Sequence, residues 1–482
     1  MSLFATKPLD VILADAEHES LKRSLTAPQL VALGIGAIIG AGLFSLTGIA
    51  AAQDAGPAVV LSFVLAAIGC AFAGICYSEF STMIPIAGSA YTYAYATMGE
   101  LMAWIIGWDL VLEYAVGAST VAVSWSAYVI SFLKDFGIAF PAAFAASPFE
   151  PVTLPGTTTV IQGIINLPAL FIVIVISGVL IIGIQESARL NSIIVVLKVA
   201  VVLIFIVLGW SYINPKNYEP FIPPNTGVTG VFGWSGVLRA AGVVFFAFIG
   251  FDAVSTAAQE AKNPKKDMPI GIIGSLAVCT ILYVLFSHVL TGIVNYTELK
   301  VAAPVALAID RTSYTWLRPA IKLAIILGFT SVILVMLLGQ SRVFFSMSRD
   351  GLLPKVFSAI HPRFRTPWRS NLLFMVFTGA FAAFAPISYL GEMTSIGTLF
   401  AFVLVCIGII IMRRTHPDLP RPFKTPLVPL IPILGIAFNV TMMYGLGWSN
   451  WARLFIWMAI GMFVYFGYSR KRVTAANPTP TQ

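Results

Sequence analysis

The chain has 482 residues, of which 58% are hydrophobic and only 10% are charged. Soluble domains carry roughly 25% charged residues, so this composition excludes an ordinary soluble protein and indicates a polytopic membrane protein. The net charge of +8 does not indicate nucleic-acid binding, because the basic residues are spread over short loops and form no single patch.

Apolar runs of roughly 20 residues, long enough to cross a bilayer, recur along the whole chain. The predicted domains are a cytoplasmic N-terminal tail (1–26), one transmembrane transporter domain (27–470) and a cytoplasmic C-terminal tail (471–482). The fold class is therefore all-α integral membrane, with twelve transmembrane helices. We expect these at approximately 28–52, 57–83, 99–132, 165–185, 191–213, 236–258, 269–293, 318–347, 370–386, 394–412, 427–447 and 451–469.

The loops between these spans carry an uneven charge. Most of the 29 Lys and Arg residues lie in loops on the side shared by the two termini. The positive-inside rule therefore predicts that both termini are cytoplasmic and that the protein resides in the plasma or inner cell membrane. On the opposite side we expect long loops at 133–164 and 294–317. We count Arg239 and Lys322, near the ends of the predicted spans 236–258 and 318–347, among the eight basic residues of that side.

The first span contains the run Gly-Ile-Gly-Ala-Ile-Ile-Gly-Ala-Gly at residues 34–42. Each glycine costs a helix interior roughly 1 kcal/mol relative to alanine, so we expect a helix break at mid-membrane. Unwound backbone at that depth is stable only when buried in protein or facing a polar cavity. Its freed N–H groups attract an anion and its freed carbonyl groups a cation, which predicts a main-chain site for a zwitterion. The alternative is that the glycines allow close helix packing.

The sixth span provides a counterpart to this run. It reads Phe-Phe-Ala-Phe-Ile-Gly-Phe-Asp at residues 245–252, with a glycine and an acid at mid-depth. Interrupted helices at matching positions of two halves are typical of transporters built from inverted repeats, and they mark the substrate site.

Ionisable side chains inside the spans are candidates for a functional role, because they are costly to bury in a membrane. Lys198 lies well inside the fifth span and is expected to be a buried lysine that exchanges a proton, unless its side chain reaches the membrane surface. Asp252 is expected either to face the cavity or to cap the second half-helix. Asp109 and Glu113 share one face of the third span. We expect Glu113 to line or gate the site or to form a structural hydrogen bond, and Asp109 to be structural.

Enzyme signatures are absent from the sequence. The four histidines are scattered and the chain lacks HExxH, GxSxG and P-loop motifs, so no protease, lipase or ATP-driven pump is indicated. The four cysteines fall inside apolar runs without a CxxC pair. We therefore predict that the protein is not an enzyme and uses neither a cofactor nor a metal ion.

Several motifs resemble those of the amino acid–polyamine–organocation superfamily. They are the glycine run through Phe44, the segment 246–260 with Asn-Pro-Lys at 263–265, and Ser-Met-Ser-Arg-Asp-Gly-Leu-Leu-Pro at 346–354. The segment Gly-Ser-Ala-Tyr-Thr-Tyr-Ala-Tyr at 88–95 is similar to the bacterial cationic amino acid transporter-like branch. The resemblance covers residues 25–470 and implies a five-plus-five inverted repeat, with broken helices 1 and 6 and two extra C-terminal helices.

The resemblance also implies a set of substrate-binding groups. The substrate carboxylate would accept hydrogen bonds from the backbone N–H groups of Gly40, Ala41 and Gly42. Phe246 would act as an aromatic lid, and Asp252 would lie beside the side-chain pocket. The substrate amine would donate to the carbonyl groups of Ile38, Phe246, Ala247 and Ile249.

In sodium-independent relatives, the lysine that matches Lys198 occupies the place of a sodium ion. By this resemblance, Lys198 would link the carbonyl of Gly36 to the eighth span near Thr330 and Ser331. The likeness therefore implies coupling to protons and no dependence on sodium.

The substrate class follows from the side chains near the predicted site. Only Asp252 and Glu113 could bind a cationic side chain, whereas Met336 and Leu337 are bulky and apolar. We expect proton-coupled transport of small to medium neutral L-amino acids by alternating access, with cationic amino acids or obligate exchange as alternatives and a channel as an alternative of another class. The expected partners are the amino acid, the proton and membrane lipid, without nucleic acid. Whether a small accessory membrane subunit binds is left open.

Overall fold

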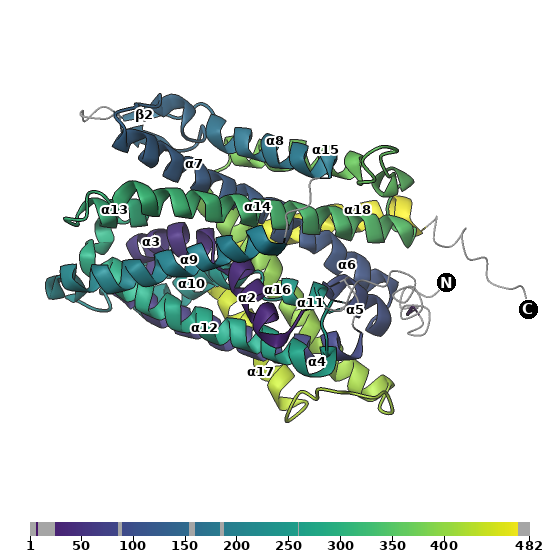
Figure 1. Ribbon diagram of the computed structural model, residues 1–482. Coiled ribbons are helices and arrows are strands. Elements are labelled where there is room, and N and C mark those ends of the chain that lie inside the picture. Colours follow the sequence, from purple (N-terminus) through teal and green to yellow (C-terminus); the bar gives the residue numbers. More distant parts are fainter. Residues whose placement is uncertain are drawn as a thin grey trace, which may run out of the picture.

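The computed structural model describes residues 6–7, 25–84, 89–153, 160–183, 188–258 and 260–470. Two short strands, β1 (Pro151–Thr153) and β2 (Val160–Gln162), form an antiparallel hairpin in which Val152 pairs with Ile161. The rest of the regular structure in these residues is helical (Figure 1). The α-helices are α2 (Ala27–Ile38), α3 (Thr47–Ala50), α4 (Val59–Met83), α5 (Ser89–Thr97), α6 (Glu100–Val111), α7 (Gly117–Asp135), α8 (Leu167–Ile182), α9 (Ala188–Gly209), α10 (Gly233–Val244), α11 (Ala253–Thr256), α12 (Pro264–Ile293), α13 (Pro304–Asp310), α14 (Arg318–Arg349), α15 (Trp368–Phe384), α16 (Ile387–Thr415), α17 (Leu430–Gly445) and α18 (Trp448–Val464).

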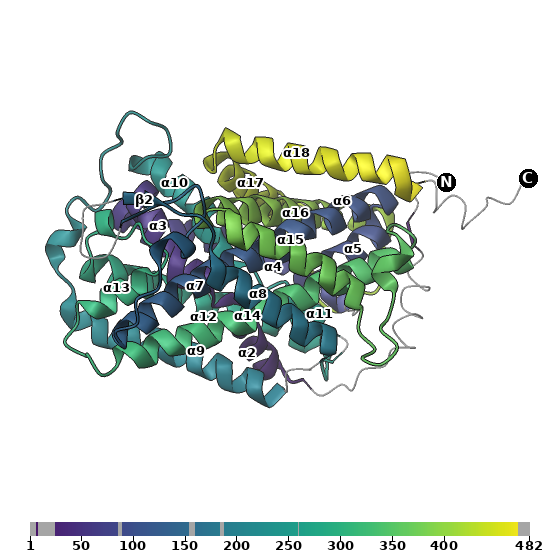
Figure 2. The same cartoon turned by 90° about the horizontal axis from the view of Figure 1, so that it is seen from above.

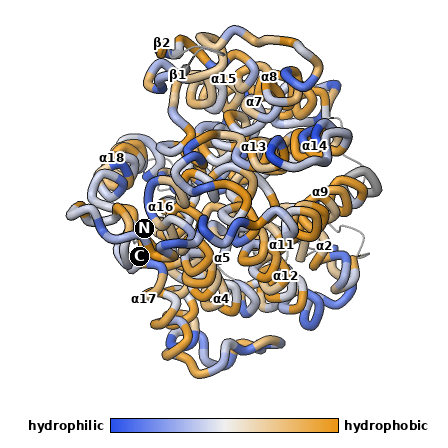
Figure 3. The backbone as a smooth tube through the Cα atoms, turned by 90° about the vertical axis from the view of Figure 1, so that its left-hand side faces the viewer, coloured by the Kyte–Doolittle hydropathy of each residue, from blue (hydrophilic) through white to orange (hydrophobic). Residues whose placement is uncertain are grey.

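The helices agree with the spans predicted from hydropathy. Each of the twelve predicted ranges overlaps helical structure. Within the described residues, eight helical stretches are long and apolar enough to cross a membrane, and α2, α8 and α17 are shorter apolar helices. Figure 3 shows hydrophobic colouring along most helices and hydrophilic colouring in the connecting loops. The prediction of an all-α membrane protein is confirmed, whereas the number of crossings stays a prediction.

The long helices run side by side and give the bundle two distinct ends. In Figure 1, α13 and β2 lie at one end, and α5 and the C-terminal end of α18 lie at the other. Figure 2 shows α18 along one side of the bundle, next to α16. The closest helix pairs join α12 to α4 and α2, α14 to α7, α15 to α8, and α16 to α17. The helices that carry the breaks, α2 and α10, pack against α12 and α4 respectively.

Local sequence signals explain where several helices begin and end. Thr26 is the N-cap of α2 and forms a capping box with Gln29, while a proline occupies the first turn. The side chain of Asn166 accepts a hydrogen bond from the N–H of Ala169 at the start of α8. The same helix ends at Gly183, whose φ of 80° is a left-handed conformation that favours glycine.

One sequence prediction about the loops is wrong. The segment 294–317 is not simply an exposed loop, because it contains α13, in which Val305 and Ala308 are fully buried. Lys322 lies inside α14 with 1% of its side chain exposed, and its Nζ is 2.8 Å from Asp135 and 3.2 Å from Asp310. Arg239 likewise lies within α10. Both residues fall within predicted spans, 236–258 and 318–347. Hydropathy could not reveal their ion pairs, because the partners lie elsewhere in the chain.

The two predicted tails, 1–26 and 471–482, fall almost entirely outside the described residues. The predicted domain boundaries therefore stay predictions.

Candidate substrate site

The first helix break lies at the predicted position. Helix α2 ends at Ile38, and Ile39 adopts an extended conformation with ψ of 107°. A π-helical turn then begins at Gly42. In the described part of the chain, the N–H groups of Gly40 and Ala41 donate no hydrogen bond to the backbone. The glycine run thus creates free backbone donors in the interior of the protein.

A second break interrupts the sixth predicted span. Helix α10 ends at Val244 and is followed by a 3-10 turn over Phe245–Phe248. Ile249 is extended with ψ of 134°, and Gly250 has φ of 112°, a conformation that residues with a Cβ rarely adopt. The chain then enters the short helix α11 after Asp252. The predicted weak point at Gly250 is therefore confirmed.

The two breaks pack directly against each other. A Cβ on Gly42 would overlap the backbone of Ala247, and a Cβ on Gly250 would lie 2.8 Å from the carbonyl oxygen of Ala37. The approach is possible because both positions lack a side chain. The glycines therefore do more than weaken two helices, since they also let the two segments of unwound backbone meet.

Tyr283 joins the two breaks, a role that the sequence analysis missed. Its hydroxyl lies 3.0 Å from the carbonyl oxygen of Ile38 and 2.9 Å from that of Ala247. Both carbonyl groups belong to the set expected to bind the substrate amine. A hydroxyl has one proton to donate, so the two acceptors share it. The only sequence signal is a phenol within the apolar run of α12.

Other members of the expected substrate set lie in or beside the breaks. Phe246 is 4% exposed, and its carbonyl accepts a hydrogen bond from the N–H of Ile249. Met336 is 7% exposed on α14, and its sulfur lies 3.4 Å from the position of a Cβ on Gly117. The structure thus places Met336 at the contact between α14 and α7.

Lys198 is buried, with 2% of the residue exposed. Its Nζ donates a hydrogen bond to the carbonyl oxygen of Gly36 over 2.8 Å, as the family resemblance implied. Its Cε lies 3.1 Å from the position of a Cβ on Gly328, so the lysine also packs against α14. Snorkelling to the membrane surface is therefore excluded in this structure.

The expected partners of Lys198 on the eighth span make other hydrogen bonds. The hydroxyl of Thr330 accepts from Trp125 Nε1 over 3.1 Å, and the hydroxyl of Ser331 donates to the carbonyl of Gly328 over 3.2 Å. Direct contact between Lys198 and Thr330 or Ser331 stays a prediction, whereas its packing against Gly328 connects the lysine to the same turn of α14.

Two buried carboxyl groups lie beside the second break. Glu113 and Asp252 are adjacent, and Glu113 also faces the hydroxyl of Thr398 on α16. Asp252 is the N-cap residue of α11, but its side chain makes no capping hydrogen bond. Neither carboxyl group pairs with a lysine or arginine in the described residues. Asp109 lies one turn away and faces Gly397, 3.1 Å from the position of a Cβ there.

This arrangement defines a class of protein. A bundle of apolar helices in which two interrupted helices cross at a buried polar centre is the architecture of a membrane transporter, with the substrate site at the crossing. Among the described residues, no group of three or more His, Cys, Asp or Glu side chains is placed to hold a metal ion.

Comparison with known proteins identifies the family. Residues 25–465 match the amino acid permease family model, and the chain belongs to this family, within the amino acid–polyamine–organocation superfamily. It is 47% identical to the branched-chain amino acid permease BcaP of Bacillus subtilis, over 98% of both chains. It is 43% identical to the methylthioribose transporter of the same organism, over 98% of both chains. A vacuolar cationic amino acid transporter of Arabidopsis thaliana is 38% identical over 86% of this chain and 64% of the relative.

The protein is therefore an amino acid transporter and not an enzyme. It is a multi-pass membrane protein, and its substrate is an amino acid.

Proposed function

We propose that this chain is a proton-coupled, sodium-independent transporter of small to medium neutral L-amino acids that works by alternating access. The observation that carries the proposal is the buried Lys198, whose Nζ lies 2.8 Å from the carbonyl of Gly36, just before the first helix break. A lysine in this position can bind and release a proton where its charge acts directly on the substrate site.

In this proposal the chain crosses the plasma membrane twelve times and both termini are cytoplasmic. Spans 1–5 and 6–10 form an inverted repeat, and α17 and α18 are the two additional helices. The position of the breaks supports the repeat, because they interrupt the first and sixth predicted spans and meet at Gly42 and Ala247.

The substrate would bind through its backbone groups. Its carboxylate would accept hydrogen bonds from the N–H groups of Gly40, Ala41 and Gly42. Its amine would donate to carbonyl groups of the two breaks, where it would replace the Tyr283 hydroxyl at one of its two acceptors, Ile38 or Ala247. Tyr283 would thus hold the empty site together, and Phe246 would cover the bound substrate.

Lys198 would couple this site to the proton. Its protonated amine holds the end of α2 through a charge-assisted hydrogen bond to Gly36. Loss of the proton weakens that hydrogen bond, so α2 can separate from α9 and α14 as the site opens to the cytoplasm. Because the ammonium group supplies a positive charge at this position, a sodium ion is not required.

The proposed preference for neutral side chains rests on two observations. Met336 presents an apolar side chain where α14 meets α7, and the relative that is 47% identical over 98% of its length is named a branched-chain amino acid permease. A cationic amino acid is the second candidate. It is favoured by the adjacent carboxyl groups of Glu113 and Asp252, which lack a lysine or arginine partner in the described residues.

Uptake by proteoliposomes tests this proposal. Purified protein is reconstituted without sodium, and uptake of labelled leucine and arginine is measured with and without an inward proton gradient. We expect the gradient to drive leucine uptake and Lys198→Ala to reduce the driven uptake at least about tenfold, the effect of losing a hydrogen bond to a charged group. Lys300→Ala, a change at an exposed lysine, is the control and should transport as the wild type does.

The alternatives give different results in the same vesicles. Full gradient-driven uptake by Lys198→Ala would contradict the coupling role. An obligate exchanger would take up amino acid only when the vesicles contain amino acid, and its uptake would not depend on pH. A channel would pass current without saturable counterflow. Uptake of arginine in preference to leucine would show that the substrates are cationic amino acids.

A further inference from the structure

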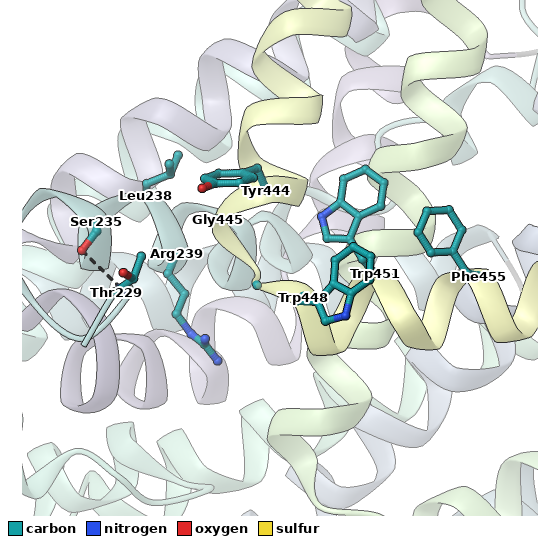
Figure 4. Close-up of a pocket in the computed structure, with 11 residues that line it drawn as sticks. Thr229, Ser235, Leu238, Arg239, Tyr444, Gly445, Trp448, Trp451 and Phe455 are labelled. Atoms are coloured by element: carbon teal, nitrogen blue, oxygen red, sulfur yellow. Dashed lines mark hydrogen bonds between the residues drawn. The ribbon is translucent and has the colours of Figure 1, made fainter.

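A pocket of about 700 Å³ lies between the start of α10, the end of α17 and the start of α18. Figure 4 shows that its two ends differ in character. Thr229, Ser235 and Arg239 form a polar end, and aromatic side chains of Trp448, Trp451 and Phe455 form the other. The pocket is therefore amphipathic along its length.

The pocket lies at the expected level of a membrane surface. Trp448 is 76% exposed at the first residue of α18, and Tyr444 is 72% exposed in the last turn of α17. Tryptophan and tyrosine at helix ends are typical of the boundary between lipid headgroups and hydrocarbon. Further along α18, Phe455, Ile456 and Phe463 are also exposed, which continues the apolar surface toward the membrane interior.

Arg239 presents a free donor to this pocket. Its Nε lies 3.1 Å from Asp54 and its Nη2 lies 3.0 Å from Glu392. Its Nη1 has no hydrogen-bond partner in the described chain. It lies 3.7 Å and 3.6 Å from the positions of a Cβ on Gly230 and Gly447. Both glycines have positive φ and no side chain, so the guanidinium edge stays accessible from the pocket.

We propose that this pocket binds a phospholipid from the leaflet opposite the chain termini. The lipid phosphate accepts hydrogen bonds from Arg239 Nη1. Guanidinium groups form strong hydrogen bonds with phosphate oxygens. The Ser235 hydroxyl lies at the same end of the pocket. One acyl chain follows the aromatic wall of Trp448 and Phe455, whose rings are 6.4 Å apart.

A phospholipid fits this pocket better than the other candidate occupants. A soluble anion would use the guanidinium but would leave the aromatic wall unmatched, and an acyl chain alone would leave the Nη1 donors unpaired. The two remaining edges of Arg239 already contact Asp54 and Glu392, so the headgroup would bind beside the ion pairs that join α10 to α16 and to the segment after α3.

Native mass spectrometry of the full-length protein in detergent tests the proposal. Phosphatidylglycerol is added and compared with diacylglycerol of the same acyl chains, which lacks the phosphate. We expect retention of phosphatidylglycerol to exceed that of diacylglycerol by about tenfold, because a hydrogen bond to a charged group changes the affinity by about that factor. Trp448→Ala and Arg239→Gln should each lower the retention of phosphatidylglycerol severalfold. Phe463→Ala, an exposed position on the same helix outside the pocket, is the matched control and should retain it fully.

Each contrary result identifies what is wrong. Arg239→Gln also removes ion pairs and can destabilise the fold, so the decisive variant is Trp448→Ala, whose side chain is exposed. Wild-type retention by Trp448→Ala, or equal retention of the two lipids, would overturn the proposal. A dimer mass that is lost in Trp448→Ala would instead assign this surface to contact between copies of the chain.

Discussion

At the residue scale, the glycines of the first break have separate roles. A Cβ on Gly42 would overlap the backbone of Ala247, whereas a Cβ on Gly40 would lie 3.5 Å from Val332, an ordinary contact distance. Gly42 is thus required where two backbones meet. Gly40 is tolerant of a methyl group, and its contribution to the proposed site is its N–H group, which alanine retains.

This difference predicts opposite results for two equally small substitutions. Gly42→Ala should lower the affinity for the transported amino acid at least about tenfold, because the two breaks must separate to accommodate the methyl group. Gly40→Ala should change the affinity less than about threefold, since the methyl group meets only an ordinary contact. Both can be measured from the rise in Tm on adding amino acid to purified protein, because a ligand of the folded state raises its stability. Equal losses in both variants would contradict a close backbone contact at Gly42.

Burial of a polar side chain can be predicted from the sequence where one residue type carries the signal by itself. A lysine inside an apolar run is costly wherever it packs, so a buried Lys198 could be predicted without knowledge of its partner Gly36. Tyr283 could not be identified in the same way. A tyrosine is unremarkable in a membrane span, and its role depends on two carbonyl groups that are 36 and 245 residues away in the chain.

At the element scale, buried ion pairs determine which helices pack together, although the helices have similar hydropathy. Glu79 on α4 is fully buried, and its carboxylate binds Arg413 on α16 in a two-bond arrangement at 2.8 and 3.0 Å. The N–H of Thr425 donates to the same carboxylate over 2.8 Å, and Arg421 lies 3.3 Å away. One side chain therefore joins α4, α16 and the loop that follows α16.

Loss of this charge should be costly. Glu79→Gln leaves two arginines partly buried without their counter-ion, and breaking a buried pair destabilises proteins by roughly 3–5 kcal/mol. We expect a Tm several degrees below that of the wild type in a thermal unfolding measurement. Glu298→Gln is the matched control, because Glu298 pairs with Arg311 at an exposed site and such pairs contribute about 0–1 kcal/mol. Similar shifts in Tm for the two variants would show that the ion pairs of Glu79 do not stabilise the contact between α4 and α16.

The sequence could predict the elements better than their connections. Apolar runs fixed the helices, because burial in a membrane demands length and hydrophobicity. The same criterion could not show that Lys322, inside α14, pairs with Asp135 and Asp310. A charged residue marks a membrane boundary only when water solvates its side chain. Lys322 does not mark one, because its ammonium group is paired with carboxylates inside the protein.

At the scale of the whole molecule, contacts close the bundle on both sides of the helix breaks. Toward one end, the backbone of Leu25, just before α2, pairs with that of Ala261, which follows α11. Beyond the breaks in the other direction, Arg239 on α10 binds Asp54 and Glu392. The proposed alternating access requires these two sets of contacts to separate at different times, so a covalent bond at one set should arrest the cycle.

The pairing of Leu25 with Ala261 allows that experiment. Paired residues of neighbouring strands have Cα atoms about 5 Å apart, within the range that a disulfide spans, and the native cysteines, all buried, give little background. Oxidation of the Leu25→Cys, Ala261→Cys variant should abolish uptake into proteoliposomes, and reduction should restore it, because α2 can no longer move away from the segment after α11. The matched control is Val152→Cys with Ile161→Cys, a cross-strand pair in the β1–β2 hairpin that should transport equally well oxidised and reduced. Full uptake by the oxidised Leu25–Ala261 variant would mean that the two breaks move as one unit, and that the site opens through a different part of the bundle.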